Sequence, residues 1–175
     1  DSVMRTLRMT LAYDGTNYVG WQRQENGLSV QQVVEEALQT FCQPGKAPVT
    51  VMGASRTDSG VHASGQVASA RVPFATPPRA VQRGLNIRLP DDVRVLEVVD
   101  ALPTFHARFD ATGKRYRYRV HLGPVLSPFI RAYAWHLPYP SDIDRMRQAA
   151  RCLVGRHDFA SFQASGVATL DSIRT

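Results

Sequence analysis

Hydrophobic periodicity in the first hundred residues constrains the fold most, because it switches four times between a strand period and a helix period. Apolar and polar residues alternate from Leu7 to Tyr13, which predicts a half-buried strand. Ser29, with Gln32 three residues later, has the pattern of a capping box and precedes apolar residues at helical spacing. The predicted strands and helices are, in chain order, 7–13, 30–41, 49–52, 65–72, 78–86 and 93–99. This order indicates an α/β domain of about a hundred residues.

The next seventy residues begin a second α/β unit. We place the boundary at Pro103, which predicts an N-terminal half at 1–103 and the start of a second, incomplete half at 104–175. Residues 114–121 alternate sharply, so we expect a strand with Tyr116 and Tyr118 on one face and arginines on the other. Residues 141–155 predict an amphipathic helix capped by Ser141.

Charge indicates the class of partner. The net charge is +6, and arginine outnumbers lysine by 19 to 2, which favours an acidic partner such as nucleic acid. The alternative is a genomic base composition that favours arginine codons. The excess is local, because residues 101–131 hold six basic residues and the single acid Asp110.

Two further patterns concern the compartment. No apolar run has transmembrane length, and the first residues lack the pattern of a signal peptide, so we expect a cytoplasmic protein without membrane contact. The two cysteines, Cys42 and Cys152, are predicted to be small core residues rather than a disulfide or a zinc site.

The segment 53–63, GASRTDSGVHA, carries the most specific chemistry. It places one carboxylate, Asp58, in a polar loop between two predicted strands, two residues after Arg56. Such a loop can hold a reactive side chain at a fixed angle while the sheet supplies rigidity. The alternative is a Ser/Thr/Asp/Gly-rich turn without function.

Five segments of the chain, in this order, resemble the TruA family of tRNA pseudouridine synthases. They are LAYDGTNYVGWQRQ at 11–24, RTDSGVHA at 56–63, FHARF at 105–109, RYRY at 115–118 and HDFASF at 157–162. Five ordered segments are far more specific than one short motif. The resemblance implies the pseudouridine synthase fold, an α/β (α+β) architecture of two similar halves around a mixed, antiparallel-rich sheet with a central basic cleft.

The resemblance also implies a reaction. Such enzymes detach uracil from its ribose, turn it and rejoin it through C5, at tRNA positions thirty-eight to forty in the anticodon stem-loop. It implies a homodimer, with no metal and no organic cofactor. Asp58 corresponds to the catalytic aspartate, and a carboxylate is a competent nucleophile. Attack at C1′, attack at C6 and abstraction of a sugar proton all remain open.

Other site residues follow from the same resemblance. The target uridine must leave the stem to react. Arg56 corresponds to an arginine that fills the space this uridine leaves or holds the RNA backbone, and Tyr116 corresponds to a tyrosine that stacks on the flipped base. The segment Phe105, His106, Ala107, Arg108 and Phe109 is predicted to bind RNA, with a sheet edge as the alternative. We interpret His62 and Asp14 as structural residues of their loops and expect Asp158 to cap the segment after it.

Departures from the family pattern limit the functional prediction. The resemblance places an arginine partner of the aspartate, and apolar residues that line the uracil pocket, beyond position 175, and residues 169–175 match loosely. We therefore interpret the chain as a portion of a longer enzyme. The alternative is a catalytically incomplete RNA-binding fragment, and an unrelated hydrolase that uses Asp58 ranks below both.

Overall fold

The computed structural model describes residues 4–163 and 172–175. Its internal contacts divide the chain after Tyr116 into two compact units. This division lies beyond the boundary predicted at Pro103, because the segment that follows Pro103 packs on the first unit. Ala107 is buried there, and its N–H donates to Ser69 Oγ at 3.1 Å.

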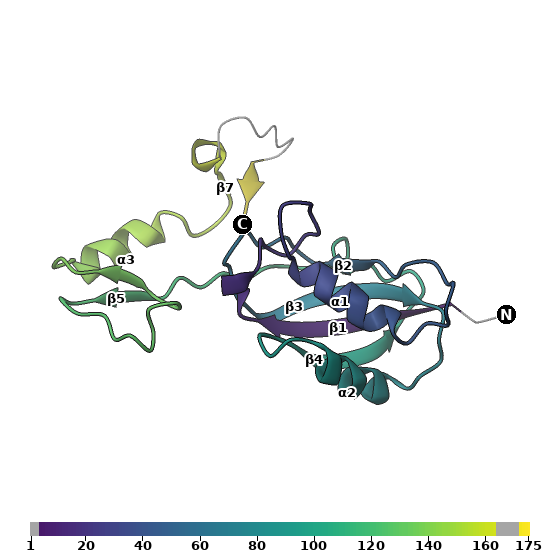
Figure 1. Ribbon diagram of the computed structural model, residues 1–175. Helices are drawn as coiled ribbons and strands as arrows, with labels where there is room; N and C mark the ends of the chain where they lie inside the picture. The colour runs from purple at the N-terminus through teal and green to yellow at the C-terminus, as the bar shows by residue number, and fades with distance from the viewer. Residues whose placement is uncertain (1–3, 164–171) are drawn as a thin grey trace. The chain divides into compact units, whose positions relative to one another are not determined.

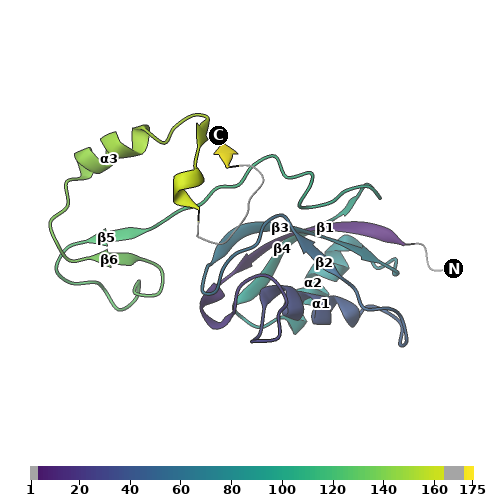
Figure 2. The ribbon, with the colours of Figure 1, turned by 90° about the horizontal axis from the view of Figure 1, so that it is seen from above.

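The first unit is a four-stranded antiparallel sheet with two helices. Strands β1 (Arg5–Tyr13), β2 (Val51–Gly53), β3 (Ala63–Val72) and β4 (Val93–Ala101) are arranged in the order β2-β3-β1-β4. Helices α1 (Val30–Gln39) and α2 (Pro78–Arg88) cover one face of this sheet (Figures 1 and 2). The predicted α/β order and the antiparallel-rich sheet are confirmed.

Strand register places the core between the sheet and the helices. Leu7 lies opposite Ala70, and Met9 lies opposite Ala68, so all four side chains share the helix-covered face and are buried. Thr6 and Ser69, each next to one of these residues in its strand, point to the opposite face, because side chains alternate along a strand. That opposite face is therefore the polar one.

The ends of the two helices refine the sequence prediction. Ser29 Oγ accepts a hydrogen bond from Gln32 N at 3.2 Å, as a capping box requires. In a full capping box the Gln32 side chain would bond back to the backbone N–H of Ser29. It donates to Glu36 at 2.9 Å instead, so only the first of the two hydrogen bonds is present. Helix α2 continues two residues beyond its predicted end at Asn86, and the Asn86 amide pairs with both backbone groups of Val95 in β4.

Strand β4 has an irregular register against β1. Thr10 pairs with Glu97 and Leu11 pairs with Val95, so Leu96 is an extra residue opposite β1. Leu96 is half-exposed while Val95 is buried. This irregularity is a β-bulge, which keeps the apolar residues on both sides of it facing the core.

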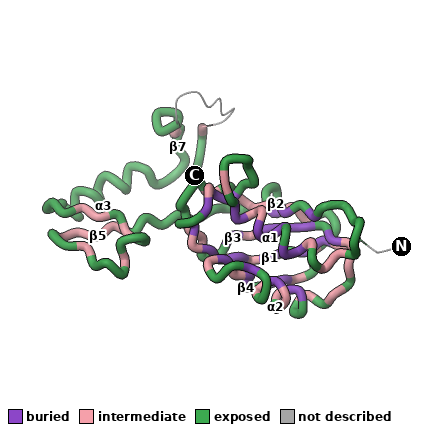
Figure 3. The backbone as a smooth tube through the Cα atoms, viewed as in Figure 1, coloured by how far each residue is buried: buried purple, intermediate pink, exposed green. Residues whose placement is uncertain are grey.

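The second unit contains short elements. They are β5 (Val120–Leu122), β6 (Trp135–Leu137), α3 (Ile143–Arg151), β7 (His157–Asp158), the 3₁₀ helix η2 (Ala160–Phe162) and β8 (Ile173–Arg174). Strands β5 and β6 are parallel, whereas β7 and β8 are antiparallel. None of its described residues is buried, in contrast to the first unit (Figure 3).

The strand predicted over 114–121 is wrong for most of its length. Only its last two residues belong to β5, because Lys114–Arg119 have no partner strand among the described residues. A strand pattern alone does not form a strand, since the backbone groups need a neighbour. Tyr116 and Tyr118 are 64% and 87% exposed, so neither ring is in a core.

Helix α3 differs from its prediction in its cap and its burial. Asp142, not Ser141, caps the helix and accepts from the backbone N–H groups of Asp144 and Arg145 at 3.1 and 3.0 Å. Cys152, just after the helix, is exposed rather than in a core. Cys42 is partly buried against the core of the first unit, and both thiols are free.

Candidate active site

Two loops that are far apart in the sequence are joined in the structure. The first follows β1 and contains the 3₁₀ helix η1 (Gly15–Asn17), and the second carries Asp58 between β2 and β3. Trp21 N donates to Thr57 O at 2.9 Å, and Ser59 Oγ donates to Tyr18 O at 3.2 Å. These bonds flank Asp58 on both sides, so the first loop fixes the backbone of the second.

Glycines allow this close approach. A Cβ atom on Gly15 would lie 2.1 Å from the carbonyl oxygen of Val61. Gly20 has a φ of +113°, and a Cβ atom there would lie 2.6 Å from Thr57 O. No larger residue fits either position without displacing the backbone next to Asp58.

Side chains from the sheet support the same loop. The Tyr13 hydroxyl and Thr57 Oγ1 are 2.8 Å apart, and Gln66 Nε2 donates to Ser55 O at 2.5 Å. Burial raises the pKa of Tyr13, and hydrogen bonds from Thr57 and Gln66 partly oppose that rise. The loop therefore rests on buried, hydrogen-bonded side chains of β1 and β3.

His62 and Asp14 join the two loops at their other ends. Gly15 N donates to His62 Nδ1 at 3.0 Å, and Asp14 Oδ1 lies 3.0 Å from the same nitrogen. Asp14 Oδ1 also accepts from Thr16 N at 3.0 Å, which caps η1. The predicted structural roles of both residues are confirmed. Asp158 likewise accepts from Ala160 N, as predicted.

Asp58 is exposed at the tip of this rigid loop. Its backbone carbonyl accepts from Val61 N at 3.1 Å and closes a turn. Within the described residues its carboxylate has no hydrogen bond or ion pair, so it is accessible to a bound molecule.

Three cationic side chains meet beside this loop. Arg56, Arg108 and Lys114 line one cavity of about 430 Å³, together with Trp21, Gln22, Gln31 and residues 51–55. The structure thus brings together two predicted site residues, Arg56 and Arg108, that lie 52 positions apart in the sequence. Asp58 and Tyr116 are not among the described residues that line this cavity.

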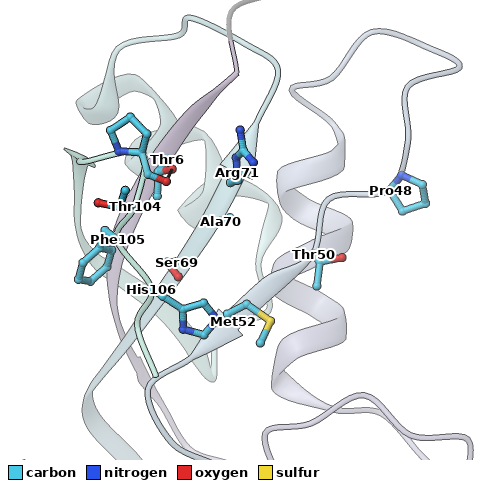
Figure 4. A pocket seen from close by; sticks show the side chains of 11 residues that line it. Thr6, Pro48, Thr50, Met52, Ser69, Ala70, Arg71, Thr104, Phe105 and His106 are labelled. Carbon is cyan, nitrogen blue, oxygen red and sulfur yellow. Dashed lines mark hydrogen bonds between the residues drawn. The ribbon is translucent and has the colours of Figure 1, made fainter. Parts of the chain in front are cut away.

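The predicted RNA-binding segment 105–109 is divided between two cavities. Phe105 and His106 line a second cavity of about 480 Å³ on the polar face of the sheet, with Arg71 on β3 (Figure 4). The exposed ring of Phe109 stacks on His106 with centroids 4.2 Å apart. Ala107 between them is the buried anchor.

Comparison with known proteins identifies the family. A family model described as tRNA pseudouridine synthase matches residues 9–110. Three curated relatives are each named tRNA pseudouridine synthase A. The chain is 48% identical to those of Syntrophotalea carbinolica and Geobacter sulfurreducens and 47% identical to that of Limosilactobacillus fermentum, over 98% of its own length. It covers 67%, 69% and 66% of these relatives.

The chain belongs to the tRNA pseudouridine synthase family. The region matched by the family model lies within the first unit and contains both joined loops. The chain spans about two thirds of the length of the relatives. The resemblance that we inferred from five short segments is therefore confirmed.

Two features of the first unit were missed at the sequence level. Lys114 lines the cationic cavity with Arg56, whereas we predicted it only as one of the six basic residues of 101–131 and as part of a strand. Glu35 is buried on α1 and accepts from Arg23 Nε and Val51 N, both at 3.0 Å. The sequence contained a signal that Glu35 is buried, because it directly follows Val33 and Val34, which belong to the apolar residues of the helix. Charged residues that are buried are usually paired.

Among residues 4–163 and 172–175, no three His, Cys, Asp or Glu side chains are grouped as metal ligands would be. In the same ranges, no helix has the length and apolar character that crossing a bilayer demands.

Tyr18 gives a prediction for alkaline pH. Burial and the neighbouring Asp92, which its hydroxyl contacts at 2.5 Å, raise the Tyr18 pKa far above its usual value of 10.0. Above about pH 10 the unfolded chain therefore loses a proton that the folded protein keeps, and stability falls as pH rises. We expect Tyr18→Phe to remove up to about 1.4 kcal/mol per pH unit of this slope. Urea unfolding between pH 9 and 11, about one unit on either side of the usual tyrosine pKa, measures how the free energy of unfolding depends on pH. Substitution of the exposed Tyr139 by phenylalanine is the control.

Proposed function

We propose that this chain carries the catalytic aspartate of a tRNA pseudouridine synthase that isomerises uridine to pseudouridine in the anticodon stem-loop, at positions thirty-eight to forty. One observation carries the proposal: the exposed carboxylate of Asp58 lies on a loop whose backbone is held on both sides by the Trp21 and Tyr18 backbone groups. A catalytic carboxylate needs such a fixed position. The family assignment supplies the reaction class.

The reaction leaves the atom count of the nucleotide unchanged. The bond between N1 and C1′ breaks, a bond between C5 and C1′ forms, the C5 proton leaves and N1 gains a proton. Asp58 acts as the nucleophile that keeps the two fragments together during the exchange. A uridine in a stem must leave the base stack to reach it, which costs a few kcal/mol.

Other residues then have defined roles. Arg56, two positions before Asp58, holds the RNA backbone at the flipped nucleotide. The exposed ring of Tyr116 stacks on the flipped uracil. The accessible residues of the segment 105–109 contact the RNA beyond the target nucleotide, and the buried Ala107 anchors the segment. We further propose that the enzyme acts in the cytoplasm as a homodimer and that residues 104–175 begin its second half.

Substitution of Asp58 tests the proposal. Asp58→Asn keeps the size of the side chain and removes the nucleophile, so we expect turnover to fall by at least about a thousandfold while tRNA affinity changes little. Release of tritium from C5-labelled uridine in tRNA measures turnover. Glu25→Gln is the matched control, because it also removes one exposed carboxylate charge.

The outcomes separate the candidate functions. Pseudouridine formed at the normal rate by Asp58→Asn would refute the role of Asp58. Salt-sensitive tRNA binding without product in the unsubstituted protein would favour an RNA-binding module. Turnover of free nucleotides without RNA would favour a hydrolase.

A further inference from the structure

Several cations of the first unit are neutralised by a nearby carboxylate, whereas those that line the cavity beside the Asp58 loop are not. Arg5, Arg8 and Arg23 each form an ion pair with a carboxylate, at 3.0, 3.2 and 3.0 Å. In the described part of the chain, the side chains of Arg56, Arg108 and Lys114 form no ion pair or hydrogen bond, and these three line the same cavity. Like charges that converge without a counter-charge repel one another, so such a cluster is stabilised by an anion.

The cavity has a rigid floor. Gly53 lies so close to the buried Trp21 ring that a Cβ atom would be 2.6 Å from it. Gln31, which also lines the cavity, donates to Val51 O at 2.9 Å and accepts from Arg23 N at 2.8 Å. Because neighbouring residues fix these groups, the cavity that the three cations line is preformed, and binding does not have to order it first.

Two of the three cations come from one anchored segment. Arg108 adjoins Ala107, whose N–H donates to Ser69 of the sheet. The nearest acid in this segment, Asp110, accepts from His106 N at 2.8 Å and is not among the described residues that line the cavity. The segment thus brings Arg108 and Lys114 to the side of Arg56 and keeps its own carboxylate outside the cavity lining.

We propose that Arg108 and Lys114, together with Arg56, bind a backbone phosphate of the RNA next to the target nucleotide. A phosphodiester matches this set, because guanidinium groups donate to phosphate in pairs and an ammonium adds a point charge. The proposal rests on the proposed function and adds to it a phosphate site distinct from Asp58. Arg56 connects the two, since it is only two residues from the carboxylate.

The two lysines of the chain provide a matched test. Lys114→Gln and Lys46→Gln remove the same charge, but only Lys114 lines the cavity. We expect Lys114→Gln to weaken binding of an anticodon stem-loop RNA about fivefold and to reduce the slope of log Kd against log salt by about 0.7 to 0.9. Lys46→Gln should leave both unchanged. Equal effects of the two substitutions would overturn the proposal.

RNAs in which a single phosphate has lost its charge show which phosphate of the stem-loop contacts the cavity. Stem-loop RNAs that each carry one methylphosphonate, which has no charge, are titrated with the unsubstituted protein and with Lys114→Gln. We expect one position at which Lys114→Gln loses less affinity than the unsubstituted protein, because only the two arginines then remain to contact that phosphate. Equal losses in both proteins at every position would refute the phosphate site.

The same proteins separate this proposal from the proposed function. If Asp58→Asn abolishes turnover while Lys114→Gln leaves the salt slope unchanged, only the phosphate site is wrong. If Lys114→Gln behaves as expected while Asp58→Asn still forms pseudouridine, only the role of Asp58 is wrong. Failure of the unsubstituted protein to bind the stem-loop would overturn both.

Discussion

Replacing Gly15 with alanine is expected to lower pseudouridine formation about a hundredfold. The added Cβ atom would lie 2.1 Å from Val61 O, and the contacted atom belongs to the backbone, which cannot rotate away as a side chain can. The Asp58 loop must therefore shift. A displacement of about 1 Å at a catalytic group costs on the order of a hundredfold in rate.

Gly65→Ala is the control for this substitution. Gly65 lies in β3 after the same loop, and a Cβ atom there would meet no atom within 4 Å. We expect turnover and tRNA affinity close to those of the unsubstituted protein. The Gly15→Ala protein should still bind tRNA and should fail mainly in turnover. Normal turnover by Gly15→Ala would show that the two loops do not set the position of Asp58.

Replacing Glu35 with alanine is expected to reduce the free energy of unfolding by about 3 kcal/mol. Its carboxylate accepts from Arg23 Nε, Gln31 Nε2 and Val51 N, each at 3.0 Å, and the side chain is largely buried. Alanine removes the carboxylate acceptor that these three donors share, and breaking a buried ion pair typically costs about 3–5 kcal/mol. The loss is expected at the lower end of this range because Arg23 is half-exposed and water can solvate its charge.

Two further variants make this measurement specific. Glu35→Gln keeps an oxygen acceptor for Val51 N and loses the charge opposite Arg23, so its loss should be about half as large. Glu36→Ala removes the neighbouring glutamate, which is exposed and bonds only Gln32 among the described residues, and should cost less than about 0.5 kcal/mol. Urea unfolding measures all three. A loss for Glu35→Ala as small as that for Glu36→Ala would contradict the buried network.

Local sequence patterns predicted the first unit well, because its elements have strong periodicity and clear caps. Leu7–Tyr13 alternates and becomes β1, and the serine at position 29 caps α1 as expected. Even the irregular register near Leu96 was visible as a break in the alternation of β4. These features depend on neighbours a few residues away, which the sequence displays directly.

Prediction failed where a pattern needed a distant partner. Residues 114–119 alternate like a strand but have no partner strand in the described part of the chain, so Tyr116 and Tyr118 are exposed. Helix α3 has the expected apolar residues, yet none of its described residues is buried. Periodicity shows which face of an element is apolar, but it does not show what covers that face.

By itself, the sequence determined the strands and helices of the first unit, the excess of positive charge and the family to which the chain belongs. Only the tertiary structure decided that Gly15 contacts Val61, that Glu35 joins three segments, and that Lys114 meets Arg56 and Arg108 at one cavity. The physical reason is separation along the chain. Hydrogen bonds and steric contacts between segments tens of residues apart depend on how the sheet and its loops pack, and no local pattern records that packing.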